Sequence, residues 1–243
     1  SPLLTTTIGK TTAVTITFNE NIDPTSTVTQ TDGPCTISTP SIAATKITFT
    51  ITGTGDGVAN FAISARDTAG NPLATTTFAY TISAANPAFS AVAPLQTVVI
   101  KSGTTLAVTF TKSVTITGTI GASVGSLAVS GSATGTTINF VPTIPSSGSV
   151  TYTFAASNGA DAQSNPLTPF TLTYTADVTA PTATFSPLVG ATIGKTTAVT
   201  ITFIENIDPT STVTYTNGPC TISTPSVTAT KITFTITGTG DGV

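Results

Sequence analysis

Acidic and amide side chains recur at one spacing in two separate loops of the chain. Asp67 is followed four residues later by Asn71, and Asp161 is followed at the same distance by Asn165. Calcium in proteins takes six to eight oxygen ligands, usually with several carboxylates among them, so these four residues and Asp177 are the candidates for a metal site. The chain has ten acidic residues and no DxDxDG loop. The alternative, that each Asp and Asn binds the backbone of its own turn, is therefore favoured.

The sequence contains few residues that are suited to catalysis. The chain contains no histidine, and histidine is the commonest general base and metal ligand. A serine or cysteine nucleophile would then need a lysine or a carboxylate to activate it, and no GxSxG or SxxK motif stands at a strand-to-helix turn. We therefore expect a protein that is not an enzyme, with no catalytic residue and no cofactor.

The two cysteines, Cys35 and Cys220, lie in nearly identical segments. One interpretation is a covalent link between neighbouring chains, because an odd cysteine in an extracellular protein can pair with another molecule. The other interpretation is burial, since Cys35 shares a strand face with Ile37 and the corresponding pair elsewhere in the chain is Leu127 and Val129. A cysteine that replaces leucine behaves as a small apolar core residue, so burial is favoured.

The charge pattern excludes two classes of partner. Charged residues make up 7% of the chain, and the net charge is −3. The cations form no basic stripe, so nucleic acid is not expected as a partner. No apolar run approaches the roughly 18 residues that cross a bilayer, and no signal peptide is visible, so we expect a mature or excised soluble segment without membrane insertion. The scattered cations are Lys10, Lys46, Arg66, Lys101, Lys112, Lys195 and Lys231.

The elements that would position all these residues are β-strands. Apolar and hydroxyl residues alternate over short segments, which directs one set of side chains into a core and the other into water. The 61 threonines of the chain suit the outward positions, because threonine is β-branched and keeps its hydroxyl in solvent. The sequence therefore predicts an all-β protein. Its clearest strands are expected at Ala13–Phe18, Lys46–Thr52, Asn60–Ala65 and Thr77–Ile82.

One unit of this kind is repeated. Residues 186–243 match residues 1–58 at 50 of 58 positions. A weaker copy lies between them, in which KSGTTLAVTFTKSV (Lys101–Val114) corresponds to KTTAVTITFNENI (Lys10–Ile22). About seven strands separated by turns fit each full copy, which is typical of an immunoglobulin-like β-sandwich. We therefore predict tandem sandwiches of two kinds, called type A and type B.

Three domains are expected: type A at residues 1–84, type B at residues 85–178, and a partial second type A at residues 179–243. The short connections around Pro87 and Pro181 carry proline, which stiffens them and favours a rod. The second type A copy stops at the equivalent of Val58 and so lacks the last two strands. Either the native chain is a longer repeat array, which is favoured, or another molecule supplies the strands by β-strand addition.

Three motifs resemble the tandem bacterial Ig-like (Big-type) repeat domains of surface-layer proteins and giant adhesins. They are TFNENIDPTS (Thr17–Ser26), ARDTAGNPL (Ala65–Leu73) and DVTAPT (Asp177–Thr182). The resemblance covers the whole chain and implies an Ig-like fold, an extracellular location at the cell surface, and a spacer role in which calcium can stiffen joints. The type B copy departs from the pattern, because TKSV (Thr111–Val114) replaces the acidic turn.

Two functions follow from these expectations. The first is a structural segment of an extracellular rod, stalk or filament, whose partners are copies of itself or adjacent repeats. A surface with few charges would let such rods pack side by side. No Asn-x-Ser/Thr sequon occurs in the sequence, so any glycans would be O-linked to threonine. The alternative is an adhesin module that binds glycans or a host surface through exposed aromatic rings. Tyr80, Tyr152 and Tyr174 are expected in or near the core, whereas Tyr215 replaces Gln30 between the two type A copies.

Overall fold

A computed structural model of the chain describes residues 1–4, 6–74 and 76–240, and their contacts form two compact units, Ser1–Val178 and Thr179–Val243. The first unit contains two separate hydrophobic cores, one built from residues 8–84 and the other from residues 92–176. The second unit contains one small core around Ile232. Each core belongs to its own set of strands.

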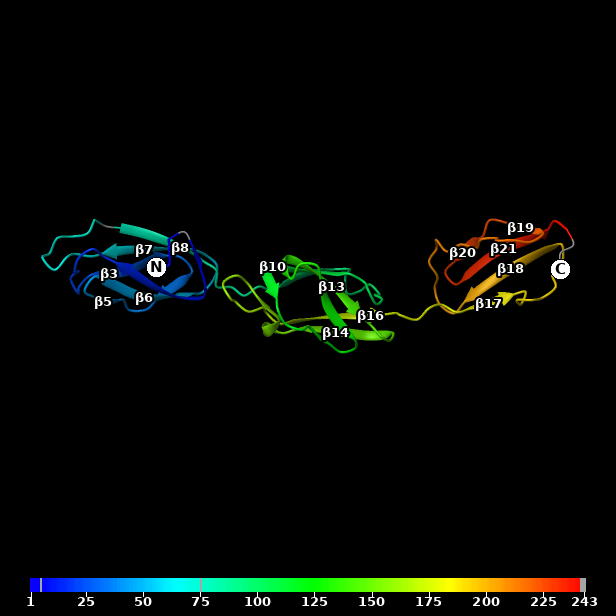
Figure 1. Cartoon of the computed structure of the whole chain (residues 1–243), viewed down its shortest axis with the longest axis horizontal. Helices are drawn as coiled ribbons and strands as arrows, with labels where there is room; N and C mark the ends of the chain where they lie inside the picture. Colours follow the sequence, from blue (N-terminus) through cyan, green and yellow to red (C-terminus); the bar gives the residue numbers. More distant parts are fainter. Residues whose placement is uncertain (5, 75, 241–243) are drawn as a thin grey trace. The chain divides into compact units, whose positions relative to one another are not determined.

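Two sheets face each other in the type A sandwich of the first unit (Figure 1). One has the strand order β1-β8-β7-β3, and the other has β2-β6-β4 with β5 also paired to β6. β1 runs parallel to β8, and the remaining pairs are antiparallel. The strands are β1 (Thr7–Ile8), β2 (Thr11–Thr17), β3 (Thr27–Asp32), β4 (Cys35–Ile37), β5 (Ser41–Ala43), β6 (Lys46–Gly53), β7 (Gly57–Ser64) and β8 (Thr76–Ile82).

The alternation along β6 shows how this sequence produces the sandwich. Ile47, Phe49 and Ile51 point inward and are at most 4% exposed, while the residues between them are threonines. Phe61 on β7 meets them from the facing sheet, with its ring centre 6.4 Å from that of Phe49. Burial of such side chains contributes about 1.5–3 kcal/mol each to the free energy of folding.

The type B sandwich has the same two-layer plan. One sheet has the order β12-β13-β10-β15 with β9 also paired to β10, and the other has β11-β14-β16. Tyr152, Phe154 and Leu172 are fully buried between them. The elements are β9 (Phe89–Ala93), β10 (Leu106–Ile116), β11 (Gly121–Ala122), β12 (Ser126–Ser130), β13 (Thr134–Thr143), β14 (Gly148–Phe154), the 3-10 helix η1 (Ala156–Asn158), β15 (Gly159–Ala160) and β16 (Phe170–Ala176).

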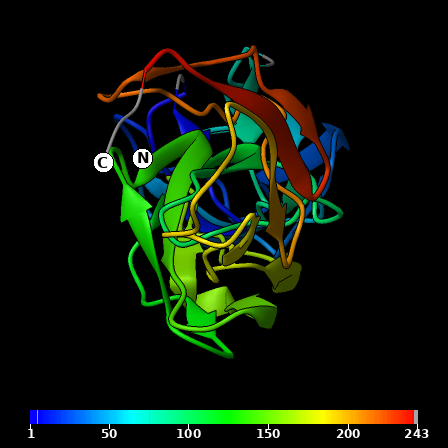
Figure 2. The ribbon, with the colours of Figure 1, turned by 90° about the vertical axis from the view of Figure 1, so that its right-hand side faces the viewer.

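The second unit is a single sheet of order β17-β18-β21-β19 with β20 also paired to β21, coloured yellow to red in Figures 1 and 2. Within residues 179–240, no strand faces this sheet as β7 and β8 face β6 in the first unit. Its inner face is therefore less buried. The strands are β17 (Ala183–Ser186), β18 (Thr196–Phe203), β19 (Cys220–Ile222), β20 (Ser226–Thr228) and β21 (Lys231–Gly238).

The prediction of an all-β chain of tandem immunoglobulin-like sandwiches is confirmed. The four expected strands correspond to β2, β6, β7 and β8 with shifts of at most three residues at an end. The division at residues 84 and 178 and the rod arrangement stay predictions, although separate cores lie on either side of residue 85. Residues 241–243 of the expected third domain lie outside the described residues.

Candidate interaction sites

Lys112 of the type B sandwich binds the end of the type A sandwich. Its Nζ lies 2.7 Å from Asp56 Oδ2 and 3.6 Å from Asp161 Oδ2. It also donates hydrogen bonds to Ser83 Oγ at 3.1 Å and to the carbonyl oxygen of Ala85 at 2.7 Å. Four oxygen atoms therefore surround an ammonium group whose side chain is 20% exposed. Partial burial reduces the screening that weakens ion pairs on an open surface.

Asp56 also holds the start of the linker between the two sandwiches. Its Oδ1 accepts the N–H groups of Ala84 and Ala85, both at 2.8 Å. The hydrogen bond from Lys112 is the largest cause that lowers the pKa of the Asp56 carboxyl below its usual value, and these two N–H groups add to it. One carboxylate thus fixes both the linker backbone and the lysine of the next sandwich.

The rest of the linker is bonded to the type B sandwich. Pro87 is buried, and its carbonyl oxygen accepts the N–H of Thr168 at 2.8 Å. Ala88 donates its N–H to Thr111 Oγ1 at 3.0 Å and accepts the N–H of Thr111 at 2.8 Å. The linker is therefore held by both sandwiches, as a stiff connection requires.

The Asp161–Asn165 turn packs against the same end of the type A sandwich. Asp161 Oδ1 accepts the N–H groups of Gln163 and Asn165. Asn165 is 3% exposed, and its Nδ2 donates to Asp161 Oδ2 at 2.9 Å and to the carbonyl oxygen of Ser83 at 2.8 Å. The carbonyl oxygen of Gln163 comes so close to Gly9 that a Cβ there would lie 3.2 Å from it. The turn therefore contacts the first sandwich at two places.

The corresponding turn of the type A sandwich lies in solvent. Asp67 Oδ1 accepts the N–H groups of Ala69 and Asn71, and its Oδ2 accepts Asn71 Nδ2 at 2.6 Å. The side-chain hydrogen bond from Asn71 is the main cause of a lowered pKa for the Asp67 carboxyl. The same Asp–Asn motif thus closes its own turn in both sandwiches.

The hydrogen bonds of these groups do not favour a calcium site. The carboxylates of Asp67 and Asp161 accept hydrogen bonds from their own turns, and the Lys112 ammonium stands beside Asp161 where a cation would bind. Asp177 Oδ1 accepts a hydrogen bond from Ser147. Over the described residues, no three His, Cys, Asp or Glu side chains converge. Calcium at the five candidate residues stays a hypothesis that this geometry does not favour.

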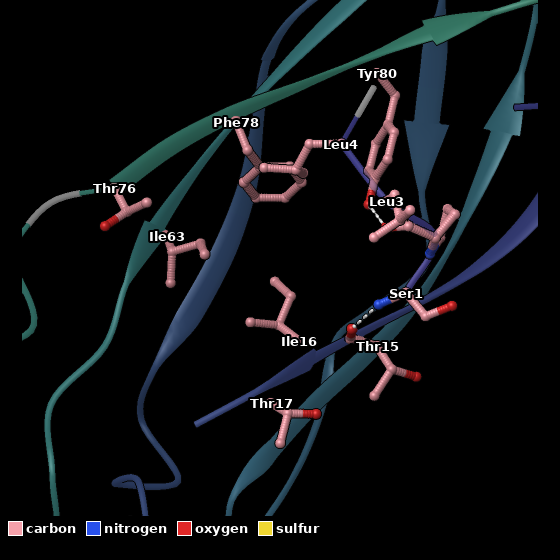
Figure 3. Close-up of a pocket in the computed structure, with 11 residues that line it drawn as sticks. Ser1, Leu3, Leu4, Thr15, Ile16, Thr17, Ile63, Thr76, Phe78 and Tyr80 are labelled. Atoms are coloured by element: carbon pink, nitrogen blue, oxygen red, sulfur yellow. Dashed lines mark hydrogen bonds between the residues drawn. The ribbon is translucent and has the colours of Figure 1, made fainter. Parts of the chain in front are cut away.

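An open apolar groove with a volume of about 310 Å³ lies beside the N-terminal segment of the type A sandwich (Figure 3). Ile16, Ile63 and Phe78 line it, and Figure 3 shows these side chains directed toward the same space. Ser1 borders the groove and donates its N–H₃⁺ to the carbonyl oxygen of Thr15 at 2.8 Å. The groove is therefore a gap along the edge of β2.

The other two copies show which side chain fills this position. In the second unit Phe185 of β17 stands opposite Ile201, and in the type B sandwich Val92 of β9 stands opposite Val108. Ile201 and Val108 both correspond to Ile16. Ser1 bonds to Thr15 as Ser186 pairs with Thr200, so the groove lies at the place where Phe185 and Val92 stand in the other two copies.

The cysteines follow the burial interpretation only where both sheets are present. Cys35 is 6% exposed, and burial raises the pKa of its thiol. Its counterpart in the type B sandwich, Leu127, is 5% exposed in the core. Cys220 is partly exposed, because the sheet that covers Cys35 has no counterpart in residues 179–240.

The tyrosines are placed as the sequence predicts. Tyr80, Tyr152 and Tyr174 are at most 2% exposed, whereas Tyr215 is 41% exposed. The hydroxyl of Tyr215 donates to the carbonyl oxygen of Gly218. Only one of the four rings is therefore available to a ligand.

Sequence reasoning missed the cluster around Lys112, although it noted the segment. The replacement of the acidic turn by TKSV put a lysine at the position of Glu20, and that charge reversal was the available signal. The partner Asp56 could not be assigned, because it lies in a different sandwich and far away in the sequence.

No protein-family model and no curated protein matches the chain. Among solved structures, the chain is similar to the I9–I11 tandem of titin, at 7% identity over 96% of this chain and 86% of that chain with a TM-score of 0.37. It is also similar to FdeC, an Escherichia coli adhesin, at 15% identity over 96% of this chain and 84% of that chain, with a TM-score of 0.33. A third similar structure is invasin, a bacterial integrin-binding protein, at 15% identity over 95% of this chain and 55% of that chain, with a TM-score of 0.30. None of the described helices is long and apolar enough to span a membrane.

Proposed function

We propose that this chain is a structural repeat segment of an extracellular rod, stalk or filament, and that its role is to carry length and tension. The observation that carries the proposal is the joint around Lys112, where a short linker is bonded to the sandwiches on both sides. Recognition domains joined by flexible linkers do not require such a joint. A stiff spacer requires it, because each flexible joint lowers the stiffness of the whole array.

In each sandwich, the parallel pairing between an early segment and the last strand supports a mechanical role. β1 runs parallel to β8, with Thr7 opposite Thr81 and Ile8 opposite Ile82. In the type B sandwich Ile100 pairs in parallel with Ala176. When the two ends of a sandwich are pulled apart, parallel terminal strands slide along each other, and their hydrogen bonds are loaded together instead of one at a time. Such an arrangement resists extension.

The threonine surface supports association with like chains. Threonine hydroxyls pair across neighbouring strands, as in Thr109 with Thr137 at 3.1 Å and Thr151 with Thr173 at 3.1 Å. A face of this kind is polar but uncharged, so two copies can come together without burying unpaired ions. Copies of the same chain, or adjacent repeats, are therefore the proposed partners, and O-glycans on threonine are the proposed modification.

Labelling of the producing cells tests this function. Antibodies raised against the chain should bind intact cells, and electron microscopy with immunogold should place the label along extended surface structures. Label that appears only after permeabilisation would overturn the proposed location, and label confined to the tips of surface structures would favour the alternative below.

The alternative is an adhesin module, and one residue favours it. Tyr215 is 41% exposed and stands where the first copy has Gln30, and exposed aromatic rings are the usual platforms for sugars. A glycan array probed with the wild-type chain and with Tyr215→Gln decides the matter. Binding that Tyr215→Gln abolishes would support the adhesin, and no binding by either chain would leave the structural role.

A further inference from the structure

The position of Lys112 carries opposite charges in the two kinds of sandwich. Its counterparts are Glu20 and Glu205 in the type A copies. Glu20 is exposed on the type A sandwich of the first unit. Lys112, by contrast, lies between Asp56 and Asp161, which are 44% and 4% exposed. The same place in the fold therefore meets solvent in the type A sandwich of the first unit and two carboxylates in the type B sandwich, while Glu205 of the second type A copy is partly buried.

A glutamate could not replace Lys112 at this joint. Its carboxylate would stand beside those of Asp56 and Asp161, and like charges at such distances repel, most strongly where water is excluded. It could also donate no hydrogen bond to Ser83 Oγ or to the Ala85 carbonyl oxygen, which Lys112 now satisfies. The end of the type A sandwich thus accepts a cation and rejects an anion.

The far end of the type B sandwich uses a different group at the position of Asp56. Ser147 stands there, because Gly148 pairs with Ala176 as Gly57 pairs with Ile82, and its Oγ accepts the N–H of Val178 at 3.0 Å, as Asp56 accepts that of Ala84. Ser147 keeps the hydrogen bond to the linker, and its own hydroxyl donates to Asp177 Oδ1 at 3.1 Å. The carboxylate at this end therefore belongs to the linker and is held by Ser147, whereas in the type A sandwich it stands at the position of Asp56 and meets a lysine. The sandwich that follows it carries Glu205.

We propose that the end of a type A sandwich around Asp56 is a docking surface for a sandwich that carries lysine at the position of Lys112, and that this charge rule makes type B follow type A. The proposal rests on the proposed function, because it explains how a repeat array would keep its order and its stiff joints. Ser83, Ala85 and Asp56 form the acceptor surface. Lys112, Asp161 and Asn165 form the matching surface of the partner sandwich.

Residual dipolar couplings of the full chain test the proposal. In the wild type, the couplings of residues 1–84 and 85–178 should fit one common alignment tensor, because the two sandwiches move as one body. Lys112→Glu should split this fit into two tensors of different magnitude, whereas Lys112→Arg should keep the single tensor. Lys101→Glu is the matched control, since Lys101 is an exposed lysine of the same sandwich, and it should keep the single tensor.

A second variant separates the charge from the linker contacts. Asp56→Asn keeps an oxygen for the N–H groups of Ala84 and Ala85 but loses the negative charge, so it should also split the tensor. Core amide shifts of both sandwiches must stay at wild-type positions in each variant, which shows that the folds are intact. A single tensor in both Lys112→Glu and Asp56→Asn would overturn the charge rule. That result would leave the surface-labelling test of the proposed function untouched.

Discussion

Ile51 and Ile236 occupy the same position in two strands of identical sequence, KITFTITG, yet Ile51 is fully buried and Ile236 is partly exposed. The difference comes from the facing sheet. β7 and β8 cover Ile51 in the type A sandwich of the first unit, and no strand of residues 179–240 does the same for Ile236. The environment of a core residue is therefore decided by strands of its sandwich other than its own.

Truncation of these two isoleucines should have unequal effects. Ile51→Ala removes atoms from a closed core and should lower the free energy of unfolding of the type A sandwich by about 2–5 kcal/mol. Ile236→Ala removes atoms that already touch water and should cost about 1 kcal/mol or less. Hydrogen exchange of the peptides that cover β6 and β21 measures both. Equal losses would contradict the open face of the second unit.

The buried tyrosine hydroxyls should fall into two classes. Tyr80 Oη donates to the carbonyl oxygen of Pro2 at 2.8 Å, and Tyr174 Oη donates to that of Pro94 at 2.7 Å. Tyr152 Oη is buried, and the described residues offer it no partner. Tyr80→Phe and Tyr174→Phe should each cost about 1 kcal/mol of stability, while Tyr152→Phe should cost nothing. Urea unfolding of the three variants checks this, and a loss at Tyr152 as large as at Tyr80 would refute it.

Alkaline pH should unfold the type B sandwich through Tyr152. Burial raises the pKa of Tyr152 from 10.0 to about 12. Because the folded-state pKa is the higher one, the stability from the neutral hydroxyl is complete below pH 10 and is lost as the pH rises through 12. Tyrosinate absorbance and far-ultraviolet circular dichroism should therefore change together in this range. Ionisation of Tyr152 near pH 10 with the fold intact would contradict this prediction.

A short N-terminal extension should close the groove along β2. Residues Ala183–Phe185 precede Ser186 in the second copy and pair with β18, so adding Ala-Thr-Phe before Ser1 should extend that pairing to Ile16. The phenylalanine would cover Ile16 and Phe78 and raise the free energy of unfolding by about 1–3 kcal/mol. Adding Ala-Thr-Ser is the control. Thermal unfolding should distinguish the two extensions, and an equal shift from both would show that the groove takes no side chain.

The strands could be predicted because their signal is local. The alternation of apolar and hydroxyl residues along β6 or β8 predicts which residues face the core, and this prediction needs no knowledge of the facing sheet. Repetition of the same pattern along the chain indicated tandem sandwiches. The burial of Cys35 followed from the same alternation and from the leucine in the corresponding strand.

The joint could not be predicted, because its contacts link residues that no local pattern connects. Lys112 meets Asp56 only after two sandwiches have folded and the linker has brought their ends together. The Asp161–Asn165 turn was recognised as a turn, but its role at the joint depends on which end of the sandwich it occupies. The groove likewise depends on tertiary packing, because Ile63 and Phe78 meet Ile16 only when the two sheets face each other.

Separate sandwich cores are joined by a polar contact, and the proposed role of this protein is to carry tension. Pulling the chain by its ends in a force spectrometer measures this most directly. We expect two separate unfolding events from residues 1–178, each releasing about 84–94 residues and therefore roughly 30 nm of chain. A single event of about twice that length would show that one shared core spans both sandwiches, and it would refute the separate cores.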